Sequence, residues 1–172
     1  MERILETERT YLRRMTWDDL DDLKEILQDE EVMYAYEHAF SDAEVRNWME
    51  TTLRRYEEDG LALYAVIDKE TGEFLGQEGL TFQEVNGRRE LEIGYLFKLK
   101  NWNKGYATEV AIALKEYACI VLGMEKVISL IRDTNLPSQK VAVRSGMVIE
   151  ESFYKNYMGK DILHYVFAVY RQ

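Results

Sequence analysis

The sequence is poor in residues that cross-link a chain or bind metals: its 172 residues include one cysteine, one proline and two histidines. A lone Cys119 excludes an intrachain disulfide and a cysteine-based zinc site. Neither histidine lies in an Asp/Glu pattern typical of a metal site, so we expect no metal. The apolar runs are shorter than the roughly 20 residues that a membrane helix needs, and the N-terminus resembles no secretory signal. These absences predict a cytoplasmic protein without a membrane partner.

Positive charge is also scarce, with 22 Lys and Arg against 32 Asp and Glu and a formal net charge of −10. Proteins that bind nucleic acid present positive surfaces, so we expect no nucleic-acid partner. The deficit lies in residues 1–90, which have 11 basic and 24 acidic residues, whereas residues 91–172 have 11 and 8. The second half could receive an anion. The acidic first half either attracts a cation or forms a solvated surface that aids solubility.

Hydrophobic residues make up 47% of the chain, enough for a core, and no repeat or Gly/Ser-rich linker interrupts it. We therefore expect one domain over residues 1–172. Periodicity, capping residues and turn residues predict a mixed α/β fold of three layers, α/β/α, with a mostly antiparallel sheet and the order β-α-α-β-β-β-α-β-α-β-β. The expected elements are strand 10–14, a helix capped by Thr16, helix 41–60, strands 61–67, 74–82 and 90–97, a helix from Lys104 to Gly123, strand 127–131, helix 138–145, and strands 147–152 and 162–170.

The stretch Leu91 to Glu109 predicts an anion site, because a strand leads through a loop into a helix. The first free N–H groups of that helix, in residues 104–108, point out of its end, where the helix dipole is positive. Lys98, Lys100 and Lys104 add three cations, and Gly105 allows a close approach of the backbone. The loop lacks the phosphate-binding pattern G-x-x-x-x-G-K and the dinucleotide pattern G-x-G-x-x-G. An ordinary strand–helix turn with a packing glycine is the alternative.

Two motifs then carry a family resemblance. The segment WNKGYATE, residues 102–109, resembles the acetyl-CoA pyrophosphate loop of the GNAT family of N-acetyltransferases. It is most similar to the ribosomal-protein-acetylating branch (RimJ/RimL-like). The second motif of that family follows as NLPS, residues 135–138, and continues to Gly146. With the predicted order of elements, the resemblance covers nearly the whole chain.

The resemblance implies acetyl-CoA as the co-substrate and a set of residues that bind it. The amides of residues 104–108 would hold the pyrophosphate, Phe97 would offer backbone groups to the acetyl carbonyl and the pantetheine arm, and Asn135 and Ser138 would bind the pantetheine side. The implied cofactor-binding residues are Phe97, Lys104, Gly105, Tyr106, Ala107, Thr108, Asn135 and Ser138. Two positions depart from the family: Trp102 replaces an Arg or Gln, and Ala142 stands where many members place the tyrosine that protonates the leaving thiolate.

Acetyl transfer to an amine needs a base that removes a proton from the amine and an acid that protonates the thiolate. Glu92 is the candidate base, because its setting resembles that of the glutamate base in histone-acetylating members. The alternative is a surface glutamate at the edge of the strands, and Glu78 is the second candidate base. With Ala142 in the tyrosine place, Ser138 or a water molecule would return the proton.

The segment VMYAYEHAFS, residues 32–41, lies between the first two helices, where this family builds its substrate lip. Its aromatic residues and one carboxylate suit a cationic or amphipathic amine, so Tyr34, Tyr36, Glu37 and His38 are the candidate substrate-binding residues. Packing of an aromatic loop is the alternative.

These observations predict an acetyl-CoA-dependent N-acetyltransferase in which a primary amine attacks the thioester directly. The acceptor could be a protein N-terminus, an amino acid or another small amine. A non-catalytic acyl-CoA-binding regulatory domain with the same fold is the alternative, suggested by the absent tyrosine. The family resemblance also allows a homodimer.

Overall fold

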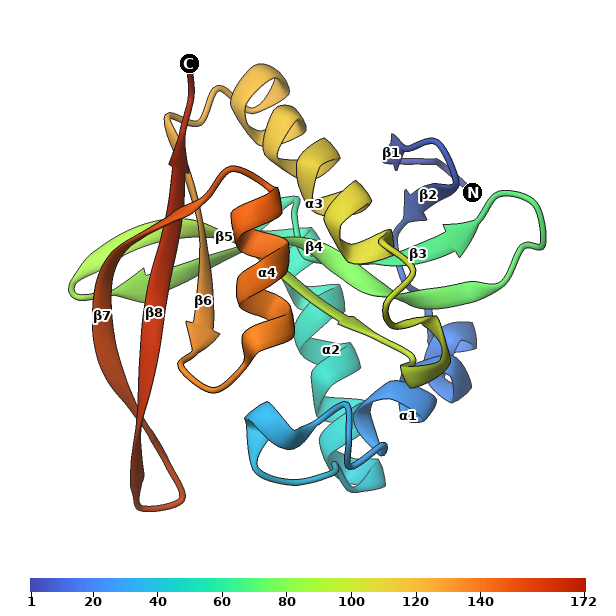
Figure 1. The fold of residues 1–172 in the computed structure, drawn as a ribbon. Helices are drawn as coiled ribbons and strands as arrows, with labels where there is room; N and C mark the ends of the chain where they lie inside the picture. Colours follow the sequence, from blue (N-terminus) through green and yellow to red (C-terminus); the bar gives the residue numbers. More distant parts are fainter.

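The computed structural model describes all 172 residues and is built around one sheet of eight strands (Figure 1). The strands follow one another across the sheet in the order β1-β2-β3-β4-β5-β6-β8-β7. All neighbours are antiparallel except β5 and β6, which run parallel. The bounds are β1 Leu5–Glu6, β2 Thr10–Arg13, β3 Leu63–Asp68, β4 Phe74–Val85, β5 Arg88–Phe97, β6 Lys126–Arg132, β7 Val148–Tyr157 and β8 Lys160–Tyr170.

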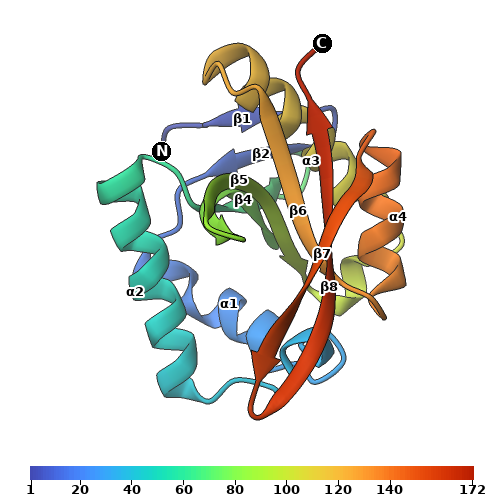
Figure 2. The same ribbon diagram turned by 90° about the vertical axis from the view of Figure 1, so that its left-hand side faces the viewer.

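Two helices cover each face of the sheet (Figure 2). The helices α1 (Leu20–Leu27) and α2 (Asp42–Asp59) lie on one side, and α3 (Tyr106–Glu116) and α4 (Leu136–Arg144) lie on the other. A buried cluster that includes Leu23, Met49 and Ala65 joins α1 and α2 to the sheet. A second cluster, with Leu80, Ile93 and Leu114, lies under α3 and α4. The predicted three-layer α/β/α fold is therefore confirmed.

Local sequence explains where the helices begin. Ser41 and Glu44 form a reciprocal capping box at the start of α2, with 3.2 Å from the Glu44 amide to the Ser41 hydroxyl and 3.1 Å from the Ser41 amide to the Glu44 carboxylate. Thr16 caps a short 3₁₀ turn, Trp17–Asp19, that leads into α1. Gly60 ends α2 at a φ of 72°, in the left-handed region that glycine tolerates.

The structure differs from the predicted elements at several ends. The strand β1 is additional; with two residues it has no period that could reveal it, and it forms only by pairing with β2. β4 and β7 run further than predicted and form long hairpins with β5 and β8. The helix α3 ends at Glu116 and continues as one wider π turn, Tyr117–Val121. No helix combines the length and the apolar character needed to cross a membrane.

Candidate active site

The parallel strands β5 and β6 separate along their length, and this opening is the centre of the site. Their backbones pair at Glu92 and Ile128. Beyond that pair, side chains bridge the two strands: the Leu130 amide donates to the Glu92 carboxylate at 2.8 Å, and the Ser129 hydroxyl donates to the Ile93 carbonyl at 2.9 Å. Backbone pairing therefore ends at Glu92, and a gap opens in the middle of the sheet just beyond it.

Two adjoining cavities meet at this gap. The first, of about 550 Å³, lies between α2 and the sheet, and we call it the α2 cavity. The second, of about 640 Å³, extends past the first turns of α3 and α4, and we call it the α3/α4 cavity. Tyr36, Arg55, Glu92 and Tyr95 line both cavities. A molecule bound on the α3 side can therefore meet a molecule bound on the α2 side at Glu92.

Glu92 is half-buried at this meeting point. Burial, which disfavours the charged carboxylate, raises its pKa to about 7, while the Leu130 amide and the charges of Lys155 and Arg55 act in the opposite direction. The alternative of a surface glutamate on an edge of the meander does not describe Glu92, because its side chain is half-buried and β6 continues the sheet beyond β5. A carboxylate with a pKa near neutrality is suited to accept a proton at physiological pH.

Glu78, the second candidate base, lies elsewhere. It pairs with Tyr95 across β4 and β5, whereas Glu92 pairs with Thr81, so the two carboxylates point to opposite faces of the sheet. Glu78 is fully buried, lines neither cavity, and has no hydrogen-bond partner on either oxygen. The structure therefore places Glu92, and not Glu78, where a bound substrate could reach it.

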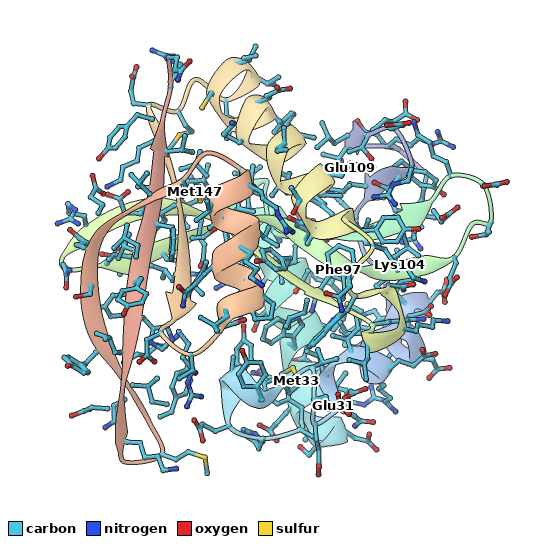
Figure 3. All side chains as sticks on the ribbon, in the orientation of Figure 1. Glu31, Met33, Phe97, Lys104, Glu109 and Met147 are labelled. Carbon is cyan, nitrogen blue, oxygen red and sulfur yellow. The ribbon has the colours of Figure 1, made fainter.

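The start of α3 presents an unusual run of free amides. None of the backbone N–H groups of residues 103–108 donates to a protein acceptor, and the first that does is Glu109, which bonds to the Gly105 carbonyl at 3.0 Å. Gly105 has a φ of 81° and Asn103 a φ of 60°, so the chain turns through left-handed conformations before the helix begins. Phe97, Lys104 and Glu109 are grouped around this turn (Figure 3). Such amides at a helix start form an anion site.

Two of the three lysines expected at this site are held elsewhere. Lys98 is buried against α1, with its ammonium 2.7 Å from Asp22 and 3.1 Å from Glu25. Lys100 pairs with Glu73 at 2.6 Å. Only Lys104 is free, and its exposed side chain does not line the cavity. The prediction of three clustered cations is wrong, because α1 and the β3–β4 turn supply carboxylates from distant parts of the chain.

The helix α4 contributes the cations instead. Lys140 and Arg144 lie one turn apart, line the α3/α4 cavity and form no ion pair. Their spacing of four residues on a predicted helix was a visible signal that sequence reasoning missed.

Asn135 caps α4: its side-chain oxygen accepts from the Ser138 amide at 3.2 Å. Asn135 and Ser138 both line the α3/α4 cavity. Ser138 is also joined to β5, because the Tyr95 hydroxyl donates to its carbonyl at 3.2 Å. Ala142, at the family's tyrosine position, is buried and offers no hydroxyl group. Tyr95, which sequence reasoning did not single out, supplies a tyrosine hydroxyl from the facing strand.

Phe97 and Trp102 form a local contact at the end of β5. The Trp102 indole N–H donates to the Phe97 carbonyl at 3.0 Å, and both residues line the α3/α4 cavity. One of the backbone groups predicted to meet the acetyl-CoA arm therefore already has a partner. Trp102, which replaces the family's Arg or Gln, closes the loop before α3 through this bond.

The lip, residues 32–41, divides into two kinds of residue. Tyr34 and Tyr36 line the cavities as predicted for a substrate lip, and burial raises the pKa of Tyr36. Glu37 and His38 line neither cavity. Glu37 pairs with Arg132 of β6 at 2.6 Å, and His38 bonds to Glu44 of α2 at 2.7 Å. These two predicted substrate residues therefore anchor the lip to the rest of the protein.

Two further lining residues complete the site. Arg55 of α2 lines both cavities and has no ion-pair partner. His164 of β8 is buried at the α3/α4 cavity, with Nδ1 3.0 Å from the Ile162 carbonyl, and burial lowers its pKa. No group of three or more His, Cys, Asp or Glu side chains is arranged to hold a metal ion.

Comparisons with known proteins identify the family. The sequence model of the acetyltransferase (GNAT) domain matches residues 9–148. The chain is 34% identical to the uncharacterized protein YkkB of Bacillus subtilis over 152 residues, 88% of each chain. It is 27% identical to the uncharacterized N-acetyltransferase YnaD of the same organism, over 90% of this chain and 87% of that one.

Solved structures share the fold. An acetyltransferase of the GNAT family from Bacillus anthracis superposes with a TM-score of 0.81 and 26% identity, over 96% of this chain and 97% of that one. The ribosomal L7/L12 alpha-N-protein acetyltransferase RimL, solved in complex with coenzyme A, has a TM-score of 0.80 and 15% identity over 98% of both chains, which shows the fold alone. The matching family model and the shared fold together define an acetyltransferase. The chain belongs to the GNAT family.

Proposed function

We propose that this protein is an acetyl-CoA-dependent N-acetyltransferase, formed by residues 1–172 as one domain, that acetylates a primary amine by direct attack on the thioester. The observation that carries the proposal is Glu92, a carboxylate with a pKa of about 7 that lies in the gap where two cavities meet. One cavity leads to the anion site of α3 and the other leads away from it, as a reaction between two separate substrates requires.

The residues of the α3/α4 cavity fit acetyl-CoA. The six free amides of residues 103–108 match a pyrophosphate, which needs N–H donors. Lys140 and Arg144 add positive charge along the same cavity, and Asn135 offers a side-chain amide to the neutral pantetheine arm. Acetyl-CoA, when bound, supplies the acetyl group as a thioester.

Glu92 would then act as the base. An alkyl ammonium ion has a pKa near ~10 and is not nucleophilic, so a proton must leave before the nitrogen attacks. The nitrogen forms a bond to the acetyl carbon, the carbon–sulfur bond breaks, and Glu92 accepts the proton directly or through water. The coenzyme thiolate leaves with the bonding electron pair and needs a proton. Ser138 remains our candidate donor, and the Tyr95 hydroxyl lies beside it.

Replacement of Glu92 by glutamine tests the proposal. We expect kcat/KM for amine acetylation to fall about 100-fold or more, the usual contribution of a general base. In the wild-type protein kcat/KM should rise with pH and level off above about 7, because the carboxyl group must lose its proton to act as a base. Thiol release from acetyl-CoA over a panel of amines measures both.

The matched control is Glu84→Gln, because Glu84 is exposed on the neighbouring strand β4 and lines neither cavity. If acetyl-CoA binds but thiol release stays at background with every amine, the alternative of a non-catalytic acyl-CoA-binding domain is correct. The homodimer stays a prediction, which light scattering after size-exclusion chromatography tests.

A further inference from the structure

The α2 cavity contains a cation, Arg55, that has no hydrogen-bond or ion-pair partner in the protein. Arg55 follows Trp48 and Thr51 on the face of α2 that lines this cavity. It is half-buried, and its guanidinium forms no hydrogen bond or ion pair. Its neighbour Arg54 is exposed and does not line the cavity, and its Nε lies 3.9 Å from the Glu58 carboxylate. An unpaired arginine in a cavity is a binding group for an anion.

The acidic residues of the same cavity do not suit a polycation. Only Glu44 and Glu92 line it, and Glu44 is engaged with His38 at 2.7 Å and with the start of α2. Glu92 is thus the single carboxylate available to an acceptor. A polyamine would bring two or more positive charges to one carboxylate and one arginine, which is an unfavourable arrangement.

The remaining walls are polar along α2 and β4 and aromatic near the lip. Thr51, Thr81 and Gln83 provide hydroxyl and amide groups. Tyr36, Phe40 and Trp48 pack edge to face, with ring centres 5.9 to 6.1 Å apart. Such a cavity fits a small molecule that has an anionic group, an amine and an apolar body.

We propose that Arg55 binds the carboxylate of the acceptor, so that the acceptor is a small amino-acid-like amine with an apolar side chain. Guanidinium and carboxylate pair through two parallel hydrogen bonds, which orients the bound molecule. Because Arg55 and Glu92 line the same cavity, an acceptor held at Arg55 can present its amine to Glu92. This inference rests on the proposed function and adds the chemical class of the acceptor.

Matched amines test the inference. We would compare phenylalanine with phenylalaninamide and with phenethylamine, which lack the carboxylate and differ in amine basicity. The wild-type enzyme should prefer the amino acid by about 10-fold or more in kcat/KM, equivalent to roughly 1.4 kcal/mol. In Arg55→Gln the ratio of the kcat/KM values should fall to near one, because the KM for phenylalanine rises. Arg54→Gln, the matched control, should keep the wild-type preference.

A different role for Arg55, as a charge that only adjusts Glu92, predicts another pattern. Arg55→Gln would then shift the pH profile equally for all three amines and leave their ratio unchanged, and this result would overturn the inference. Should Arg55→Gln fold poorly, 3-phenylpropionate provides a test on the wild-type protein. It should inhibit competitively against the amine, and less so in Arg55→Lys; no inhibition contradicts the inference.

The two proposals fail differently. If the enzyme acetylates phenethylamine as efficiently as phenylalanine, the inference about Arg55 is wrong, but the proposed N-acetyltransferase function still holds. If an aminoalkyl phosphonate is acetylated in preference to phenylalanine, the site binds another kind of anion, and the proposal that Arg55 binds a carboxylate is wrong. Absence of thiol release with every amine removes both.

Discussion

Glu78 is a carboxyl group in the interior of the sheet, between the register positions of Tyr64 and Tyr95. Neither of its oxygens has a hydrogen-bond partner, and burial raises its pKa well above the usual value of 4.5. A buried carboxyl group without a partner is destabilising in its charged form, so it is kept neutral by holding its proton. Glu78 therefore affects the stability of the folded protein. Glu92, in contrast, lies where bound molecules can reach it.

Substitution of Glu78 by glutamine should stabilise the protein at neutral and higher pH. Above about pH 4.5 the unfolded chain loses the proton that folded Glu78 retains, so wild-type stability falls as pH rises through that window. Glutamine does not titrate. We expect a gain of about 1–3 kcal/mol at pH 8 that shrinks as pH falls towards 4.5. Urea unfolding at pH 5 and pH 8 measures this difference. An equal gain at both pH values would contradict the argument, and Glu84→Gln should give no gain at either.

At the scale of elements, the conformation of the loop before α3 depends both on its own residues and on contacts with a distant part of the chain. Gly105 needs its positive φ of 81°, and the motif around it was readable from the sequence. A Cβ at this position would lie 3.4 Å from the Arg9 guanidinium, which pairs with Glu109 at 2.9 Å and so ties the N-terminal hairpin to α3. The glycine leaves the free amides open to an anion.

Replacement of Gly105 by glutamate should weaken acetyl-CoA binding by about 30-fold or more, roughly 2 kcal/mol. The new carboxylate would occupy the positive end of α3 and repel phosphate. Gly123→Glu is the matched control, because Gly123 also has a positive φ, 70°, and open space around it. It carries the same backbone strain at the other end of the helix segment. Titration calorimetry with coenzyme A measures the affinity, and an unchanged value would mean that the loop does not bind the pyrophosphate.

The elements themselves were largely predictable. Capping boxes, turn glycines and the change of hydrophobic period are local signals, and they located four helices and most of the strands. The ends of β4 and β7 were not, because residues 83–85 of β4 and the mostly exposed residues 153–157 of β7 extend only through pairing with β5 and β8.

At the scale of the whole molecule, the acidic residues that give the net charge of −10 do not gather at the site. The α2 cavity is lined by one acidic residue of the first half, Glu44, and this residue is paired. This favours the interpretation of the acidic half as a solvated surface. The α3/α4 cavity has a positive border, with the unpaired Lys140, Arg144 and Lys155 along it. An anionic co-substrate therefore meets a local field opposite in sign to the net charge.

Joint replacement of Lys140 and Arg144 by glutamine should raise the KM for acetyl-CoA by about 3- to 10-fold at low ionic strength. The effect should shrink in 0.5 M salt, because salt screens interactions between exposed charges. Arg46→Gln with Arg54→Gln makes the same change in net charge at residues that line neither cavity, and should leave KM nearly unchanged. Equal effects of the two pairs would show that net charge, and not the border of the cavity, governs binding.

The sequence by itself determined the order of the elements from β2 onward, the motifs at residues 102–109 and 135–138, the family, and Glu92 as the candidate base, because each depends on contiguous residues or on a short period. Only the tertiary structure decided which charges are free. Lys98 and Lys100 are neutralised by Asp22 and Glu73, and Glu37 is held by Arg132, whereas Arg55, Lys140 and Arg144 remain unpaired. Ion pairs between distant residues depend on which helix face meets which strand, and a single sequence does not contain that information.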